Sequence, residues 1–216
     1  MFTRQEKAAE RSLVGIGAGT TSEKRRIAAV DLYWLPLGAG GHFVRLNGRV
    51  YETLAAWMRN RQARDLYHSA LQIEVAGSSF VVEQAPVRDR SGEQRGVVAE
   101  GPVGSHLAGR FRIFRYEVRL WRDGRIPDVA EAVDSPRRLT NDEDHARRVL
   151  DSVAQIPTPV WGRDELGTGE MWNSNSVIAW VLTRSGMDAG SIEPPVGGRA
   201  PGWRAGYEVA RRECGR

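Results

Sequence analysis

The sequence predicts an α+β domain in which helices pack against an antiparallel sheet. Two segments, 66–75 and 112–121, alternate apolar and polar residues and run into turn-forming residues, which is typical of strands joined in hairpins. Two later segments, beginning near Thr140 and Asn173, carry apolar residues at helical spacing. The chain has 216 residues, enough for one domain with a substantial core. Sequential hairpins combined with separate helices favour the α+β class.

The N-terminal part is expected to hold an arm and the first ordered elements. Residues 1–26 are polar and basic and predict a flexible basic arm. The segment Ile27–Trp34 predicts a buried strand, and the glycines within 38–41 predict a turn. Residues 42–50 predict another strand, and the apolar stripe in 53–64 predicts a helix.

The clearest hairpin is predicted between 66–75 and 80–83, with a turn at 76–79. Successive side chains of a strand point to opposite faces of the sheet. One face therefore receives Tyr67, Ser69, Leu71, Ile73 and Val75, and the other receives His68, Ala70, Gln72 and Glu74.

The segment 112–121 predicts a further strand, in which Ile113, Val118 and Leu120 are candidates for burial. Its aromatic residues favour a place in the core or at the sheet edge over a binding platform; they are Phe111, Phe114, Tyr116 and Trp121. We expect one domain over 27–210, followed by a basic tail over 211–216.

Composition and charge exclude several classes of function. The first 26 and the last 21 residues each carry a net charge of +3, so the residues between them carry −2, and no nucleic-acid partner is expected. The single cysteine excludes a disulfide framework and a cysteine metal site. The histidine spacing predicts no bound metal, and no phosphate loop or other cofactor motif is present. The lack of a signal segment or a long apolar stretch predicts a cytoplasmic protein.

A hydroxyl nucleophile and a histidine on separate elements are the best candidates for chemistry. Ser174 lies at the predicted start of a helix, where free backbone N–H groups stabilise developing negative charge. His68 opens a strand, and the returning strand carries Glu83 and Gln84, either of which could orient the imidazole.

These two segments resemble a known superfamily. The run Asn173-Ser174-Asn175-Ser176-Val177-Ile178 is similar to the Asn-Cys-x-x-Phe-Val helix start of lecithin–retinol acyltransferase-like proteins. The run from Tyr67 to Glu83 resembles the histidine-led hairpin of NlpC-type peptidases. A histidine strand followed by a nucleophile helix is the order of circularly permuted papain-like proteins. The resemblance covers roughly 66–84 and 172–182, and it implies that fold.

The resemblance also implies an activity, namely hydrolysis or transfer of an acyl group at an amide or ester without a cofactor. The substrate would be a small molecule, a peptide or a lipid acyl group. Ser174 takes the position of the nucleophile, His68 that of the base, and Glu83 or Gln84 that of the orienting group, with Asn173 a possible support for the oxyanion. The family has cysteine where this chain has Ser174. The serine could be a natural nucleophile, the mark of a degenerate site, or an engineered replacement.

Other interpretations stay open from the sequence. Asn173 and Ser174 are ordinary helix-capping residues. His42, with Glu52 as its orienting group, is a rival base, and Trp172 and the loop 161–165 could line a cleft. A binding domain that keeps the fold without catalysis is the main alternative function. A binder of nucleic acids or anionic surfaces through the arginine-rich ends is the third.

Overall fold

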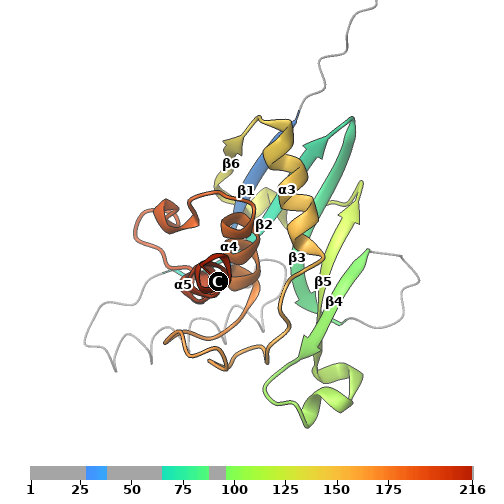
Figure 1. The fold of residues 1–216 in the computed structure, drawn as a ribbon, viewed down its shortest axis with the longest axis vertical. Coiled ribbons are helices and arrows are strands. Elements are labelled where there is room, and N and C mark those ends of the chain that lie inside the picture. The colour runs from blue at the N-terminus through green and yellow to red at the C-terminus, as the bar shows by residue number, and fades with distance from the viewer. Residues whose placement is uncertain (1–27, 38–64, 88–95, 216) are drawn as a thin grey trace, which may run out of the picture.

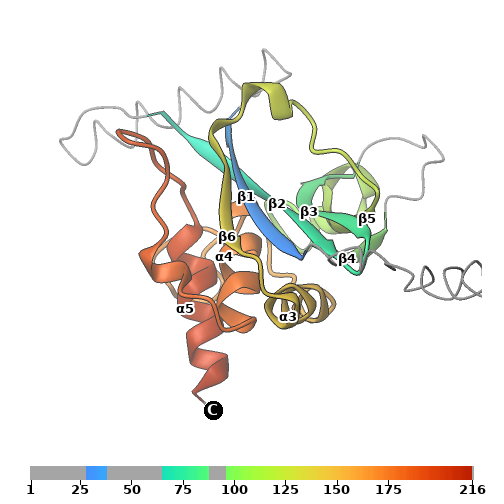
Figure 2. The same ribbon diagram turned by 90° about the horizontal axis from the view of Figure 1, so that it is seen from above.

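The computed structural model describes residues 28–37, 65–87 and 96–215 (Figure 1). These residues form a six-stranded antiparallel sheet with its main helices on one face (Figure 2). The α+β class is therefore confirmed. Several predicted features lie outside the described residues, namely the arm 1–26, the turn 38–41, the strand 42–50, the helix 53–64, and the residues His42 and Glu52.

The sheet has the strand order β4-β5-β3-β2-β1-β6. The strands are β1 (Ala29–Pro36), β2 (Tyr67–Val75), β3 (Ser78–Pro86), β4 (Val97–Pro102), β5 (Arg115–Arg122) and β6 (Val133–Thr140). The predicted first strand and the β2–β3 hairpin are confirmed, whereas β4 and β6 were not predicted. Short β4 and strongly polar β6 are the two edge strands, so each buries too little apolar surface to give a clear pattern.

The sheet opens between β2 and β3 at one end. The pairing of these strands runs from Val75 opposite Ser78 to Leu71 opposite Val82 and stops there. Beyond that point β2 continues to Tyr67 beside β1, and β3 continues to Pro86 beside β5. The two strands thus lose their shared hydrogen-bond ladder at the positions that carry the predicted site residues of the hairpin.

Within the described ranges, three α-helices cover one face of the sheet, α3 (Glu143–Val153), α4 (Ser174–Arg184) and α5 (Trp203–Cys214) (Figure 2). The first two confirm the predicted helices. The third was not predicted, and its last turn includes residues 211–214 of the segment expected as a basic tail. The apolar face of α5 is narrow because small and charged residues are interspersed in its sequence. Its helical spacing was therefore not recognised.

The core lies between the sheet and the helices. Leu71, Ile73 and Val82 point from the sheet toward Val149 of α3 and Ile178 of α4, and all five are fully buried. The opposite face carries a smaller apolar cluster of Leu35, Ala70, Val81 and Ile126, which is covered in part by the connection from β5 to β6 (Figure 2). The face that α4 covers is thus the one that carries Leu71 and Ile73.

Helices α4 and α5 approach each other closely. A Cβ atom added at Gly206 would lie 1.9 Å from the carbonyl oxygen of Ser176, so only glycine fits there. Trp203, at the start of α5, packs against Trp34 of β1 with ring centroids 5.0 Å apart. These contacts hold α5 against both α4 and the sheet.

The segment before β5 departs from its predicted strand. Residues 108–114 form two short 3₁₀ turns, η1 (Ala108–Arg110) and η2 (Arg112–Phe114), neither of which has a buried residue. The expected burial of Ile113 and the expected core or edge position of Phe111 and Phe114 are therefore wrong. Val118 and Tyr116 are buried as predicted. In the described part of the chain, no helix is long and apolar enough to span a membrane.

Candidate functional site

The N-terminus of α4 is built by an asparagine cap. The side-chain oxygen of Asn173 accepts hydrogen bonds from the backbone N–H groups of Asn175 (2.9 Å) and Ser176 (3.4 Å). In return, the hydroxyl of Ser176 accepts one from the backbone N–H of Asn173 (3.1 Å). The Asn173 amide nitrogen donates to the carbonyl of Pro201 (2.8 Å). Both ends of the Asn173 side chain are therefore engaged, so its expected role at an oxyanion is replaced by capping.

Asn175 docks the first turn of α4 onto β2. Its side-chain oxygen accepts a hydrogen bond from the hydroxyl of Ser69 (2.9 Å). Its amide nitrogen donates to the carbonyls of Tyr67 and Pro201, each at 2.9 Å. Because Asn175 is buried, these three bonds satisfy polar groups that have little access to water.

Ser174 occupies the first helical position and remains largely free. The residue is 8% exposed, and within the described part of the chain neither its hydroxyl nor its backbone N–H makes a hydrogen bond. The cap of Asn173 serves the next two N–H groups and leaves this one available. Two donors thus remain at the positive end of the helix dipole.

Gln84 adds an unpaired amide on the same face of the sheet. It lies on β3 two residues from Val82, which faces the helices, and it is 6% exposed. Both polar atoms of its side chain are buried without a hydrogen-bond partner among the described residues. Ser69, which contacts Asn175, holds the corresponding position on β2, two residues from Leu71. Gln84 therefore lies across the open end of the hairpin from Ser69, on the face that α4 covers.

Trp172 directly precedes the cap of α4. It is 2% exposed, and in the part of the chain that the structure describes its indole N–H has no hydrogen-bond partner. Buried tryptophans usually pair this group. Together with the Gln84 amide, it makes this end of the fold a concentration of buried polar groups without partners, which is rare in native proteins.

His68 lies on the opposite face of the sheet. It pairs with Leu35 of β1, whose side chain belongs to the apolar cluster remote from the helices. Burial lowers the pKa of His68 to about 4, while the Asp128 carboxylate in the covering connection acts in the opposite direction. The alternation expected from the sequence is confirmed, and it directs the imidazole away from α4. The structure does not bring His68 and Ser174 together.

Glu83 shares the face of His68 but pairs with an arginine. Its carboxylate accepts a hydrogen bond from Nη1 of Arg119 (2.9 Å). The same guanidinium also binds Glu117 on β5, and all three side chains are buried. The expected role of Glu83 as the group that orients His68 is therefore replaced by an ion pair within the sheet. Of the predicted site residues, Trp172, Asn173 and Ser174 lie at the start of α4, Gln84 lies on the face of the sheet that α4 covers, and His68 and Glu83 lie on the other face.

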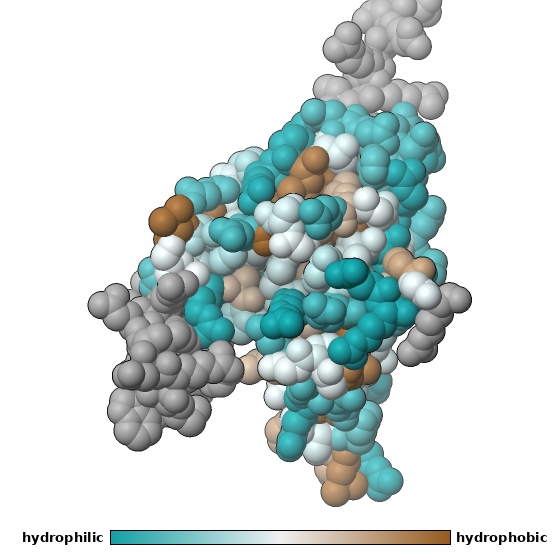
Figure 3. All heavy atoms as spheres, turned by 60° about the vertical axis from the view of Figure 1, so that its left-hand side comes forward, coloured by the Kyte–Doolittle hydropathy of each residue, from teal (hydrophilic) through white to brown (hydrophobic). Residues whose placement is uncertain are grey.

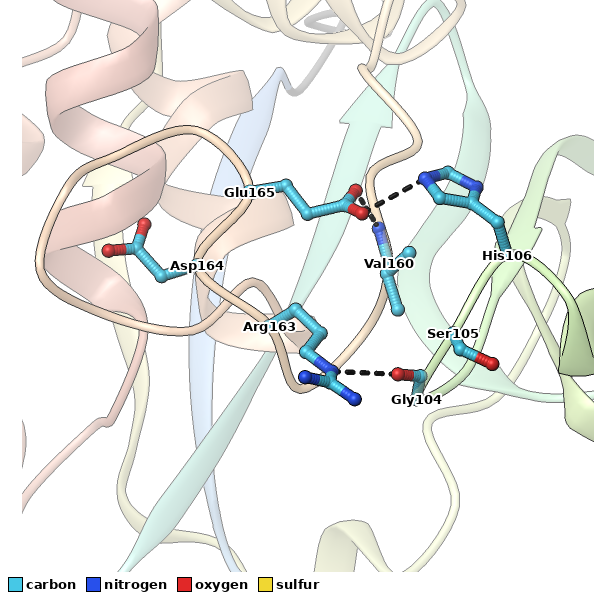
Figure 4. Close-up of a pocket in the computed structure, with 7 residues that line it drawn as sticks. All are labelled: Gly104, Ser105, His106, Val160, Arg163, Asp164 and Glu165. Atoms are coloured by element: carbon cyan, nitrogen blue, oxygen red, sulfur yellow. Dashed lines mark hydrogen bonds and ion pairs between the residues drawn. The ribbon is translucent and has the colours of Figure 1, made fainter.

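A second site is an open surface pocket of about 430 Å³ between two loops (Figure 4). Nε2 of His106 contacts a Glu165 oxygen at 2.9 Å, and the other carboxylate oxygen accepts the backbone N–H of Val160 (2.8 Å). Arg163 donates to the carbonyl of Gly104 (2.8 Å). The Asp164 carboxylate instead accepts backbone N–H groups of its own loop, which lowers its pKa. The loop expected to line a cleft thus lines this pocket.

Sequence reasoning missed the parts that Ser69 and Asn175 play. The sequence contains a signal for Asn175, because the second asparagine of Asn-Ser-Asn-Ser is not needed for capping. The sequence contains no such signal for Ser69, because a serine is common between the buried positions of a strand and its partner Asn175 is distant in the sequence. The described residues contain no cluster of three side chains suited to a metal ion.

Comparison with family models, with curated proteins and with solved structures found no match to this chain. The resemblance of residues 66–84 and 172–182 to papain-like proteins therefore stays a prediction.

Proposed function

We propose that this chain is a permuted papain-like domain whose polar groups near the N-terminus of α4 bind an acyl group through its carbonyl or carboxylate oxygen. The order of elements supports the fold, since the histidine-bearing β2 precedes α4 and the start of α4 docks on β2. The single observation that carries the function is the set of unpaired polar groups on Ser174 and Gln84 at the open end of the β2–β3 hairpin.

Hydrogen-bond donors at this site suit an oxygen acceptor. The hydroxyl and backbone N–H of Ser174 stand at the positive end of an eleven-residue helix. The amide of Gln84 contributes a donor and an acceptor in surroundings of low polarity, where each hydrogen bond is stronger than in water. A carbonyl or carboxylate oxygen would accept hydrogen bonds from Ser174 and from the side-chain nitrogen of Gln84, and it would remove the free-energy penalty of about 1–3 kcal/mol for leaving that buried nitrogen unpaired.

Binding is favoured over catalysis because the described residues supply no base for the Ser174 hydroxyl. His68 faces the other side of the sheet, and Glu83 is held by Arg119. A serine hydroxyl needs a general base within hydrogen-bond reach to become a nucleophile. The site thus keeps the oxyanion-binding part of an acyl-transfer centre. A cytoplasmic location is part of the same proposal.

The experiment is a titration of the full ¹⁵N-labelled chain, followed by NMR, with two acyl probes. Octanoate represents a lipid acyl group, and N-acetylalanine amide represents a peptide. At least one probe should shift the side-chain amide signals of Gln84. The variants Gln84→Leu and Ser174→Ala should weaken that binding about tenfold or more, because each removes a hydrogen-bonding group. The exposed-site controls Gln155→Leu and Ser191→Ala should bind normally. Binding unaffected by both site variants would overturn the proposal.

Acyl transfer by Ser174 is the second candidate, favoured by its free hydroxyl beside a helix N-terminus. It requires a base such as His42, which lies outside the described residues. A fluorophosphonate probe, which reacts with activated serines, separates the two functions. Labelling that disappears in both Ser174→Ala and His42→Ala, but persists in His68→Ala, would favour catalysis. An unlabelled protein that still binds an acyl probe would favour the binding domain.

A further inference from the structure

We propose that the segment 105–115, which connects β4 to β5, docks onto a membrane surface that contains anionic lipid. This segment comprises η1, η2 and their flanking residues. It forms one end of the molecule, at the foot of Figure 1, where hydrophobic side chains lie among hydrophilic ones at the lower tip of Figure 3. The surface is distinct from the start of α4 and does not depend on the function proposed there.

Large apolar side chains are exposed on this segment to an unusual degree. The exposed fraction is 68% for Leu107, 66% for Phe111, 79% for Ile113 and 44% for Phe114. Four such residues within eight positions form a contiguous stretch, whereas single exposed apolar residues are normal on protein surfaces. Exposure of these four apolar side chains to water is unfavourable, whereas their burial against a partner would be favourable.

Backbone hydrogen bonds hold the apolar side chains in place. Phe111 donates to the carbonyl of Ala108 (2.9 Å), and Phe114 donates to that of Phe111 (3.0 Å). The hydroxyl of Ser105 caps the first turn by accepting the backbone N–H of Ala108 (3.1 Å). Gly109 lies so close to Pro102 that a Cβ atom there would come within 2.5 Å of its side chain. The exposed residues are therefore presented by an ordered turn anchored to β4.

The charges of the segment are all positive. Residues 101–116 contain Arg110, Arg112 and Arg115 and no aspartate or glutamate. Arg110 and Arg112 are exposed and form no ion pair with any described residue, whereas Arg115 binds Glu100 (3.1 Å). The nearby Glu165 is engaged by His106. Arginine matches lipid phosphate groups with paired hydrogen bonds.

The combination selects a lipid surface as the partner. Phenylalanine, leucine and isoleucine gain free energy in the boundary between headgroups and acyl chains, and neighbouring arginines gain it from anionic headgroups. A nucleic acid would leave Leu107 and Ile113 in water. The alternation Arg110-Phe111-Arg112-Ile113 places both kinds of side chain on one short tip, which fits shallow insertion.

The experiment is sedimentation of the full chain with phosphatidylcholine vesicles that either contain or lack phosphatidylserine. The chain should bind the phosphatidylserine vesicles more tightly. F111S/I113S should weaken this binding at least tenfold, and R110Q/R112Q should weaken it about 25-fold at low salt, about fivefold for each arginine. The matched controls V196S and R204Q change an exposed valine and an exposed arginine elsewhere and should bind normally.

Both loop variants keep residues 1–26, so binding through that basic segment would survive in them. Equal binding by F111S/I113S and V196S would overturn the proposal, as would equal binding to both kinds of vesicle. Failure of the wild-type chain to bind any vesicle, with self-association that F111S/I113S abolishes, would also overturn it and would assign the surface to a protein partner. Circular dichroism should show the same folded spectrum for all four variants.

Discussion

The hydroxyl of Ser69 on β2 donates a hydrogen bond to the side-chain oxygen of Asn175 on α4, at 2.9 Å. This bond fixes the start of α4 on the face of the sheet to which Ser69 points. Because neighbouring residues of a strand face opposite sides, it also assigns His68 to the other face. One contact thus decides which of the predicted site residues can act together.

Asn175→Ala should destabilise the domain. The change leaves the Ser69 hydroxyl and the Tyr67 carbonyl buried without their partner, at a cost of about 2–4 kcal/mol in the free energy of unfolding. Urea denaturation followed by circular dichroism measures the effect. The exposed control Asn141→Ala should change the value by less than about 0.5 kcal/mol. Equal stability of the two variants would contradict the docking role of Asn175.

Gln84→Leu should stabilise the ligand-free protein by about 1–2 kcal/mol, because it removes two buried polar atoms that lack partners. If the amide is retained for binding at the expense of stability, its removal should increase the free energy of unfolding. Thermal unfolding gives the measurement. Gln72→Leu is the matched control, since the Gln72 side chain is hydrogen-bonded to Tyr33 and Ser79 on the other face, and it should be neutral or destabilising. A loss of stability in Gln84→Leu would argue against an unpaired amide.

Stability should fall on acidification between about pH 6.5 and pH 4, because of His68. Burial lowers its pKa from 6.5 to about 4, so in this window the unfolded chain binds a proton that the folded chain does not. The contribution is complete above pH 6.5 and is lost as the pH falls, by up to about 3 kcal/mol. The partial exposure of His68 makes that figure an upper limit.

Denaturation at a series of pH values tests this dependence. His68→Leu should flatten the curve between pH 4 and 6.5, whereas the control His106→Gln, at a histidine whose side chain is 73% exposed, should keep the slope. Direct titration of the imidazole signals by NMR checks the cause. A normal pKa for His68, or an unchanged slope in His68→Leu, would remove the physical basis of the prediction.

Arg119→Met should be strongly destabilising. The guanidinium bridges two buried carboxylates from adjacent strands, Glu83 and Glu117, and its removal leaves both without a positive partner. Breaking a buried pair in this way typically costs about 3–5 kcal/mol. Arg122→Met, three residues further along β5 with a side chain 69% exposed, is the control and should have little effect. Comparable unfolding midpoints would show that the pair contributes nothing to the sheet.

Much of the fold could be predicted from the sequence because its signals are local. The cap at Asn173 and the apolar spacing after it define α4, and the alternation from Tyr67 to Val75 defines β2. Edge strands and α5 escaped prediction because their burial depends on a few contacts with distant elements, such as Trp203 on Trp34. The turns at 108–114 escaped because their apolar residues are exposed, contrary to the usual meaning of an apolar pattern.

The sequence by itself determined that His68 and Ser69 point to opposite faces of a strand and that Asn173 begins a helix at Ser174. Period and capping are properties of neighbouring residues. Only the tertiary structure decided which face α4 covers. Burial of Leu71 and Ile73 against Ile178 outweighs any local preference. It brings Ser69 to the start of α4 and puts Gln84 on the covered face, while His68 and Glu83 face away. Which of the predicted site residues share a face with α4 depends on this tertiary packing, and no local sequence pattern indicates it.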